Sequence, residues 1–288
     1  MSRLLNIACL QTRPMPTMES ALTEALPMAE AAVRAGAQML FLPEYCGGLM
    51  AEKARLCPPS RPESDHPVLG AFCDFAAKHG VWVNIGSVAV DGAQGKIVNR
   101  GYMIGDAGTV HGHYDKIHLF DVDLSDDAVY RESDTVMSGS AAQLYDTPLG
   151  RVGHTICYDL RFPGLFRDLA QAGAEILCCP AAFTKTTGEA HWHVLNRARA
   201  IENTCYVVSA CAVGPVPGGG ESYGHSLVVS PWGDVLADGG DIPGVIHARI
   251  DLDAVGATAA RIPSLGDDRP YRGADTPKSA NTTKRDVA

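Results

Sequence analysis

Short apolar runs recur along the whole chain, and their lengths predict β-strands. Each run is followed within a few residues by glycine, proline or a charged side chain, as is usual where strands end. The predicted strands are Leu4–Thr12, Met39–Glu44, Val81–Val90, Val98–Gly105, Arg151–Asp159, Glu175–Phe183, Cys205–Val213, Gly224–Ser230 and Val245–Asp251. Helix-like segments separate several of these runs, so we expect βα units.

Four segments have the apolar spacing or terminal residues of helices. They are Thr17–Ala35, Pro67–His79, Pro163–Ala172 and Ala190–Asn203. Pro27 lies inside the first of them and predicts a kink or a break there. Between positions 81 and 115 the strands follow one another through glycine-containing turns with no helix, which predicts a mixed sheet. So many strands favour two sheets stacked face to face and covered by helices, in the α/β class.

Composition indicates one large globular domain rather than a membrane protein. Hydrophobic residues make up 46% of the 288 residues, yet no run approaches the eighteen apolar residues of a membrane span. We expect one domain over residues 1–263 and a polar tail over 264–288 that becomes ordered only if something binds it, for instance at a dimer contact. The N-terminus shows no signal-peptide cleavage site, so we expect a cytoplasmic protein.

The charge balance favours a small molecule as the binding partner. The formal net charge is −9 and the pI is near 5.5, which argues against nucleic acid or an anionic membrane surface. Nine cysteines in a chain without an export signal indicate reduced thiols rather than disulfides. No dinucleotide fingerprint or P-loop is present, so we expect no cofactor.

Three predicted strands end in residues that together could perform nucleophilic catalysis. The first ends in Leu-Pro-Glu at Glu44, another ends just before Lys116, and a third carries Cys157 followed by charged residues and proline. A thiol is a nucleophile only when a base removes its proton and another group stabilises the negative charge. Glu44, Lys116 and Cys157 supply a base, a cation and a nucleophile.

This set predicts hydrolysis of an amide. Glu44 would take the thiol proton of Cys157, and Lys116 with the backbone N–H of Tyr158 would hold the oxyanion. Glu44 would then return its proton to the leaving ammonia, and water would release the acid from the thioester. Glu132 is the candidate for a second, supporting carboxylate.

Histidine pairs raise the alternative of a metal site, which the pattern does not favour. His111 and His113 precede the lysine motif, and His191 and His193 lie in a predicted helix, where a spacing of two does not align side chains. The sequence indicates no third ligand near either pair, so we expect no metal centre. The glycine-rich segment Pro215–Glu221 is predicted to be a mobile surface loop.

The motifs at these strand ends resemble those of the nitrilase, or carbon–nitrogen hydrolase, superfamily. Glu44 matches the family's catalytic glutamate, Lys116 its lysine, Cys157 its cysteine and Glu132 its second glutamate. The likeness extends from Asn6 to about Pro263. The resemblance implies a four-layer α-β-β-α sandwich and homodimers, or larger homo-oligomers, that pack their cysteine-bearing faces together.

Within the superfamily the chain resembles the branch of deaminated glutathione amidase and ω-amidase. Four segments carry this likeness: Lys116–Asp123, Ala190-His191-Trp192, Arg197–Glu202 and Ser222–Ser226. Two departures from the branch are His193, where the family usually has glutamate, and the glycine-rich loop.

Substrates of this branch are short acids with a terminal amide. A cation should therefore bind the distal carboxylate, and Arg161 and Lys185 are the candidates. Deaminated glutathione is the favoured substrate. ω-Amidase action on α-ketoglutaramate, N-carbamoyl hydrolysis, nitrile hydrolysis and a catalytically silent binding scaffold remain alternatives.

Overall fold

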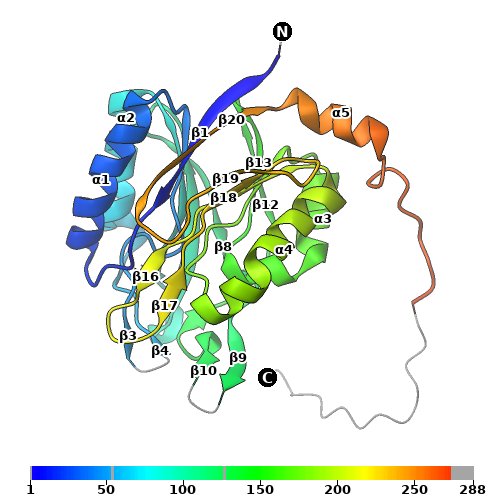
Figure 1. The fold of residues 1–288 in the computed structure, drawn as a ribbon. Helices are drawn as coiled ribbons and strands as arrows, with labels where there is room; N and C mark the ends of the chain where they lie inside the picture. Colours follow the sequence, from blue (N-terminus) through cyan, green and yellow to red (C-terminus); the bar gives the residue numbers. More distant parts are fainter. Residues whose placement is uncertain (1, 53–54, 126–127, 274–288) are drawn as a thin grey trace, which may run out of the picture.

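The computed structural model describes residues 2–52, 55–125 and 128–273 (Figure 1). Within this part of the chain, no helix has both the length and the apolar character needed to cross a bilayer. The N-terminal strand lies in the middle of the molecule, and the last described residues extend away from its body beyond α5 (Asp253–Arg261) (Figure 1).

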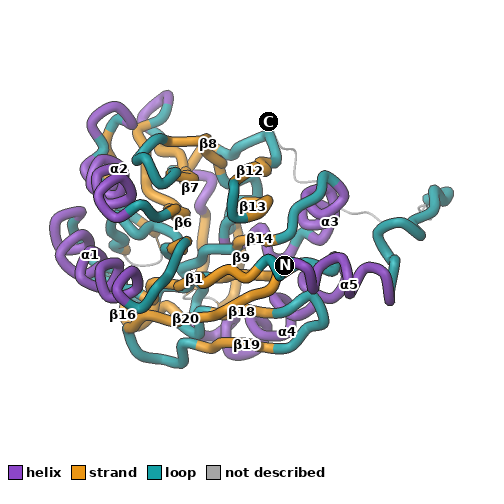
Figure 2. The backbone as a smooth tube through the Cα atoms, turned by 90° about the horizontal axis from the view of Figure 1, so that it is seen from above, coloured by secondary structure: helices purple, strands orange, loops and turns teal. Residues whose placement is uncertain are grey.

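Two β-sheets lie face to face between two layers of helices (Figures 1 and 2). Helices α1 (Met18–Arg34) and α2 (Pro67–His79) cover the outer face of the first sheet, where α1 contacts β20 and β1 and α2 contacts β6 and β7. Helices α3 (Pro163–Gln171) and α4 (Lys185–Asn203) cover the second sheet. This arrangement confirms the predicted four-layer sandwich.

The first sheet has the strand order β11-β7-β6-β2-β1-β20, with β5 and β8 added at β6 and β7. Strands β1, β2 and β6 run parallel, whereas β7 and β20 pair in the antiparallel sense, so the sheet is mixed as predicted. The strands are β1 (Leu4–Gln11), β2 (Met39–Phe41), β5 (Ser60–Arg61), β6 (Trp82–Asp91), β7 (Ile97–Ile104), β8 (Val110–Asp115), β11 (Val136–Met137) and β20 (Gly244–Asp251).

The second sheet has the order β12-β13-β14-β15-β18-β19, in which β13, β14 and β15 are parallel. Its strands are β12 (Gln143–Thr147), β13 (Gly150–His154), β14 (Ile176–Cys178), β15 (Tyr206–Ser209), β18 (Leu227–Val229) and β19 (Val235–Asp238). Three separate hairpins pair β3 (Ala51–Glu52) with β4 (Arg55–Leu56), β9 (Asp121–Ser125) with β10 (Ala128–Arg131), and β16 (Val213–Pro215) with β17 (Glu221–Tyr223).

Short 3₁₀ turns connect several elements. They are η1 (Glu63–Asp65), η2 (Ala93–Gly95), η3 (Glu132–Asp134) and η4 (Cys157–Arg161).

Alternation of side chains along the strands builds three apolar cores. On β1, Ile7 points into the core between the two sheets, and its neighbour Ala8 packs in the core beneath α1 and α2. On β14, Ile176 points between the sheets and Leu177 packs beneath α3 and α4. Successive strand residues point to opposite faces, so a strand buried on both faces must be apolar throughout.

The first helix forms as one unbroken element. Thr17 caps it, with its hydroxyl oxygen accepting a hydrogen bond from the Ser20 N–H at 3.1 Å. Pro27 lies inside the helix, so the predicted break at this residue is wrong. Packing of the Ala25 and Ala29 face against the first sheet holds the turns on both sides of the proline together.

A buried histidine joins the two sheets just before Cys157. His154, on β13, lies 3.1 Å from the Gly86 carbonyl and 3.3 Å from the Asn84 amide nitrogen, both on β6. Burial lowers the pKa of His154 to about 4, so its neutral ring can donate through Nε2 and accept through Nδ1. A Cβ on Gly101 would lie 2.4 Å from this ring, so only glycine leaves room for it.

Several predicted elements begin or end at different residues. The strand predicted through Asp159 ends at His154, and Cys157 begins η4 instead, because Asp159 turns back to accept the Ile156 N–H at 2.8 Å. Lys185 is the first residue of α4 rather than a loop residue. Residues 274–288, most of the predicted tail, lie outside the described residues; within the described part, the Ser264 carbonyl accepts a hydrogen bond from Arg167 at 2.6 Å.

Candidate active site

Glu44 lies in the turn that follows β2 and is only 4% exposed. Its Oε1 accepts hydrogen bonds from Lys116 Nζ at 2.9 Å and from Asn99 Nδ2 at 2.8 Å. Its Oε2 accepts the backbone N–H of Ala182 at 2.9 Å. Contacts from both sheets therefore fix the direction of this carboxylate.

Lys116 follows the last residue of β8 and is buried between two carboxylates. Its Nζ lies 2.9 Å from Glu44 and 2.9 and 3.0 Å from the two oxygens of Glu132. Burial alone would lower the pKa of Lys116, but the charges of Glu132 and Glu44 outweigh it and hold the pKa well above its ordinary value. The ammonium is therefore a permanent cation.

Glu132 begins the turn η3, and its buried carboxylate contacts Lys116 rather than solvent. Its carboxylate also accepts the Phe120 N–H at 2.6 Å and contacts the Tyr45 hydroxyl at 3.4 Å. Both oxygens of Glu132 accept hydrogen bonds, so this carboxylate holds the ammonium of Lys116 in place.

Cys157 stands at the sharp start of η4, with a φ of +48° that few non-glycine residues adopt. Its N–H donates to the Pro180 carbonyl at 2.8 Å. Asp159 is fully buried and accepts hydrogen bonds from the Tyr114 hydroxyl at 2.7 Å and from the His118 N–H at 3.1 Å. These hydrogen bonds hold the η4 turn in place. These contacts explain how the strained backbone at the cysteine is maintained.

The Cys157 thiol is protonated at rest. Burial raises its pKa well above the ordinary value, and the charge of Glu44 raises it further, whereas Lys116 acts in the opposite direction. The Glu44 carboxylate lines the same cavity as the thiol. A thiol with a raised pKa becomes a nucleophile only if a neighbouring base takes its proton.

A cavity opens above Cys157, with Glu44, Lys116 and Glu132 in its wall. Tyr158, whose backbone N–H is predicted to bind the oxyanion, also lines it. The remaining lining is mostly apolar or hydroxyl-bearing and comes from in or beside three hairpins, from the segment after β14 and from the start of α4: Leu49, Ala51, Leu56, Phe120, Tyr130, Ala182, Phe183, Thr184, Thr187, Val216, Gly219, Gly220, Glu221 and Ser222.

The glycine-rich segment predicted as a loop forms part of this wall. It is the turn between β16 and β17, and its Pro217 carbonyl accepts the Ala51 N–H at 2.8 Å from the neighbouring hairpin. Gly218, with a φ of +90°, lies so close that a Cβ would be 1.8 Å from the Ala51 carbonyl oxygen. The two hairpins thus pack backbone to backbone over the cavity.

Comparison with known proteins identifies the family. The model of the carbon–nitrogen hydrolase family matches residues 6–260. The chain belongs to the carbon–nitrogen hydrolase family. A Yersinia enterocolitica relative, named deaminated glutathione amidase, is 38% identical over 240 residues, covering 82% of this chain and 84% of its own.

Solved structures agree with this assignment. The Caenorhabditis elegans NitFhit protein superposes with a TM-score of 0.84 at 33% identity over 92% of this chain, which spans 65% of that longer protein. Saccharomyces cerevisiae Nit3, a member of branch 10 of the nitrilase superfamily, gives a TM-score of 0.79 at 26% identity, with 90% of this chain and 94% of Nit3 covered. The protein is a hydrolase of carbon–nitrogen bonds other than peptide bonds.

Arg161 and Lys185 are the two cations predicted to bind a substrate carboxylate. Neither of them lines the cavity of this hydrolase. Arg161 lies 3.3 Å from the His191 ring nitrogen and 5.5 Å from the centre of the Phe183 ring. Lys185 pairs at 3.0 Å with Glu221, which does line the cavity.

Sequence reasoning missed the amide that holds the hydrolase's two carboxylates apart. The side-chain amide of Asn99 donates to Glu44 at 2.8 Å and approaches Glu132 at 3.5 Å. The backbone carbonyl of Asn99 accepts the backbone N–H of Lys116. Its signal was a single polar residue inside the apolar run of β7. Such a residue in a buried strand must find a partner, but the sequence does not say which.

We predict that Gly218→Ala lowers kcat/KM at least about tenfold by pushing the two hairpins apart at the cavity wall. Gly214→Ala is the matched control, because Gly214 lies in the same hairpin and also has a positive φ, of +91°, but no atom lies within 4 Å of its Cβ position and it does not line the cavity. It should change kcat/KM less than about threefold, since only local backbone strain is added. Steady-state kinetics on an amide would measure both, and equal losses would contradict a role for the packed wall.

Proposed function

We propose that this hydrolase is a cysteine-dependent amidase that converts the terminal amide of a small carboxylated substrate into an acid and ammonia. One observation carries the proposal: a thiol, a permanent ammonium and a bound carboxylate, from strand ends distant in sequence, meet at one cavity. These are the nucleophile, the oxyanion stabiliser and the proton carrier that amide hydrolysis requires.

In the first half-reaction the Cys157 sulfur forms a bond to the amide carbon as Glu44 takes the thiol proton. The carbonyl oxygen becomes negative, and Lys116 Nζ with the Tyr158 N–H stabilises it. When the carbon–nitrogen bond breaks, Glu44 passes its proton to the departing nitrogen, which leaves as ammonia. A thioester on Cys157 remains.

In the second half-reaction water replaces ammonia at the same position. Glu44 takes a proton from water as its oxygen attacks the thioester carbon, and the proton then returns to the sulfur as the carboxylic acid leaves. Lys116 stays charged throughout because Glu132 remains bound to it. The site needs no metal or cofactor for either step.

Deaminated glutathione is the favoured substrate. The name of the Yersinia enterocolitica relative supports this choice, and the threonine and serine hydroxyls of the cavity wall can hydrogen-bond an amide-rich chain. The substrate's distal carboxylate would contact Arg161 or Lys185, the second after displacing Glu221. ω-Amidase, N-carbamoyl hydrolase and nitrile hydrolysis activities are the enzymatic alternatives.

We also propose that the protein works as a homodimer or larger homo-oligomer in the cytoplasm. The superfamily resemblance supports association through the faces that carry the cysteine turn. All nine cysteines are free, which is typical of proteins from a reducing compartment.

Replacing the nucleophile should abolish turnover. We predict that Cys157→Ala lowers kcat at least about a thousandfold, because the covalent step is lost. Glu44→Gln should slow both half-reactions, because Glu44 carries the proton in each, so the acyl adduct on Cys157 is sought by intact-protein mass spectrometry of the unsubstituted protein quenched during turnover. Turnover of no amide, together with no adduct, would instead favour the catalytically silent scaffold.

Substrate choice is tested with a panel of amides. Release of ammonia from deaminated glutathione should exceed that from α-ketoglutaramate, from N-carbamoyl compounds and from nitriles. Lys185→Met should raise KM for carboxylated amides at least about tenfold and leave neutral amides nearly unchanged. Equal losses on both kinds of amide would show that Lys185 does not bind the carboxylate.

A further inference from the structure

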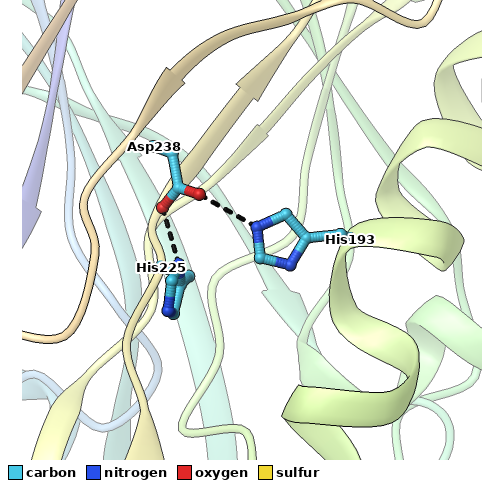
Figure 3. Close-up of side chains that lie close together, drawn as sticks. All are labelled: His193, His225 and Asp238. Carbon is cyan, nitrogen blue, oxygen red and sulfur yellow. Dashed lines mark hydrogen bonds and ion pairs between the residues drawn. The ribbon is translucent and has the colours of Figure 1, made fainter.

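Three side chains outside the catalytic cavity converge on one point of the surface (Figure 3). His193 extends from α4, His225 from the turn before β18, and Asp238 from the end of β19. The carboxylate of Asp238 lies between the two rings, 2.9 Å from His193 Nε2 and 2.8 Å from His225 Nδ1. One donor atom from each residue lies within 4.8 Å of the other two.

This donor set is one that transition metals prefer. Two imidazole nitrogens and one carboxylate oxygen bind Zn²⁺ at about 2.0–2.2 Å, which places tetrahedral ligands about 3.3 Å apart. The two nitrogen–oxygen distances, 2.8 and 2.9 Å, are shorter than this spacing, and all three donor atoms lie within 4.8 Å of one another, so rotations of these side chains would admit an ion. The ion would take the place of the protons that now link each imidazole to the carboxylate.

The neighbouring residues hold the imidazole rings in place. The Tyr223 ring stacks on His225 with 4.6 Å between ring centres, and the two histidine rings lie 5.1 Å apart at a steep angle. The backbone of His225 is fixed in a left-handed conformation with a φ of +51°. A site whose ligands are already oriented loses little entropy when it binds an ion.

The local charge also favours a cation. A small cavity beside His225 is lined by the carboxylates of Glu189, Glu221 and Asp241, with Lys185 as the cation among its described lining residues. Asp238 adds a further carboxylate at the cluster itself. This excess of negative charge raises the local concentration of metal ions.

We propose that His193, His225 and Asp238 form a binding site for a Zn²⁺-class divalent metal ion, with water completing its coordination. The site joins α4 to the turn after β17 and to the end of β19. Glu221 and Ser222, on β17, line both the small cavity and the catalytic one. A bound ion therefore fastens the wall of the active site from outside, in a structural rather than a catalytic role.

The sequence indicates no third ligand near either histidine pair, and for that reason it does not predict a metal centre. The fold supplies the two other ligands from positions 32 and 45 residues further along the chain (193 to 225 and 193 to 238). The two histidines of each pair do not share a site. His191 contacts Arg161, and the His111 ring packs at a tilt against Trp82.

Isothermal calorimetry with Zn²⁺ alone tests the proposal, using the full chain without a polyhistidine tag. A Cys157→Ser background removes the catalytic thiol, which would otherwise bind the ion. We expect one ion per chain, with affinity at least about tenfold lower in His193→Gln and in Asp238→Asn. The matched control, His191→Gln, removes an exposed imidazole from the same helix and should leave the affinity unchanged.

Two further measurements on the same background use the intact site. Bound Co²⁺ should give visible absorption without a strong thiolate charge-transfer band, and saturating Zn²⁺ should raise the melting temperature by at least about 3 °C. Absence of stoichiometric binding, binding that survives both substitutions, or a dominant thiolate band would overturn the proposal.

Discussion

A buried ammonium held between two carboxylates is the interaction on which the catalytic arrangement depends. Removing three charges from water costs several kcal/mol per ion unless close partners compensate for it. Here Lys116 contacts both Glu44 and Glu132, and the Asn99 amide and the Ala182 N–H satisfy the remaining carboxylate oxygens. The cluster is therefore stable only when all its members are present, and this fixes the position of Glu44 beside the thiol.

The two stacked sheets explain how these groups meet. The first sheet supplies Glu44 and Lys116 from the ends of β2 and β8, and the second supplies Cys157 just beyond β13. His154 joins the sheets through hydrogen bonds to β6, so the carboxyl ends of the strands keep a fixed spacing. The bulk of each sheet supports this edge, and hairpins beside it form part of the cavity wall.

Periodicity was enough to predict the layers, because strands buried on both faces leave apolar runs and helices leave spaced stripes. The apolar runs also single out Glu44, Lys116 and Cys157 as candidate site residues, because charged or reactive residues at the ends of such runs are conspicuous. The structure brings these three residues to one cavity. It could not predict the turn at Cys157, which depends on contacts from Tyr114 and His118 that are distant in sequence. Pairings across the fold, including Asn99 with its two carboxylates and the cluster around Asp238, arise only when the sheets assemble.

A crystal structure of the protein with an aldehyde analogue of its amide substrate tests the central claim most directly. An aldehyde adds to a thiol without a leaving group, so it traps the tetrahedral geometry of the oxyanion. The account predicts a bond from Cys157 Sγ to the aldehyde carbon, with the resulting oxygen within about 3 Å of both Lys116 Nζ and the Tyr158 N–H. An adduct whose oxygen points away from Lys116, or attachment at a different residue, would contradict it.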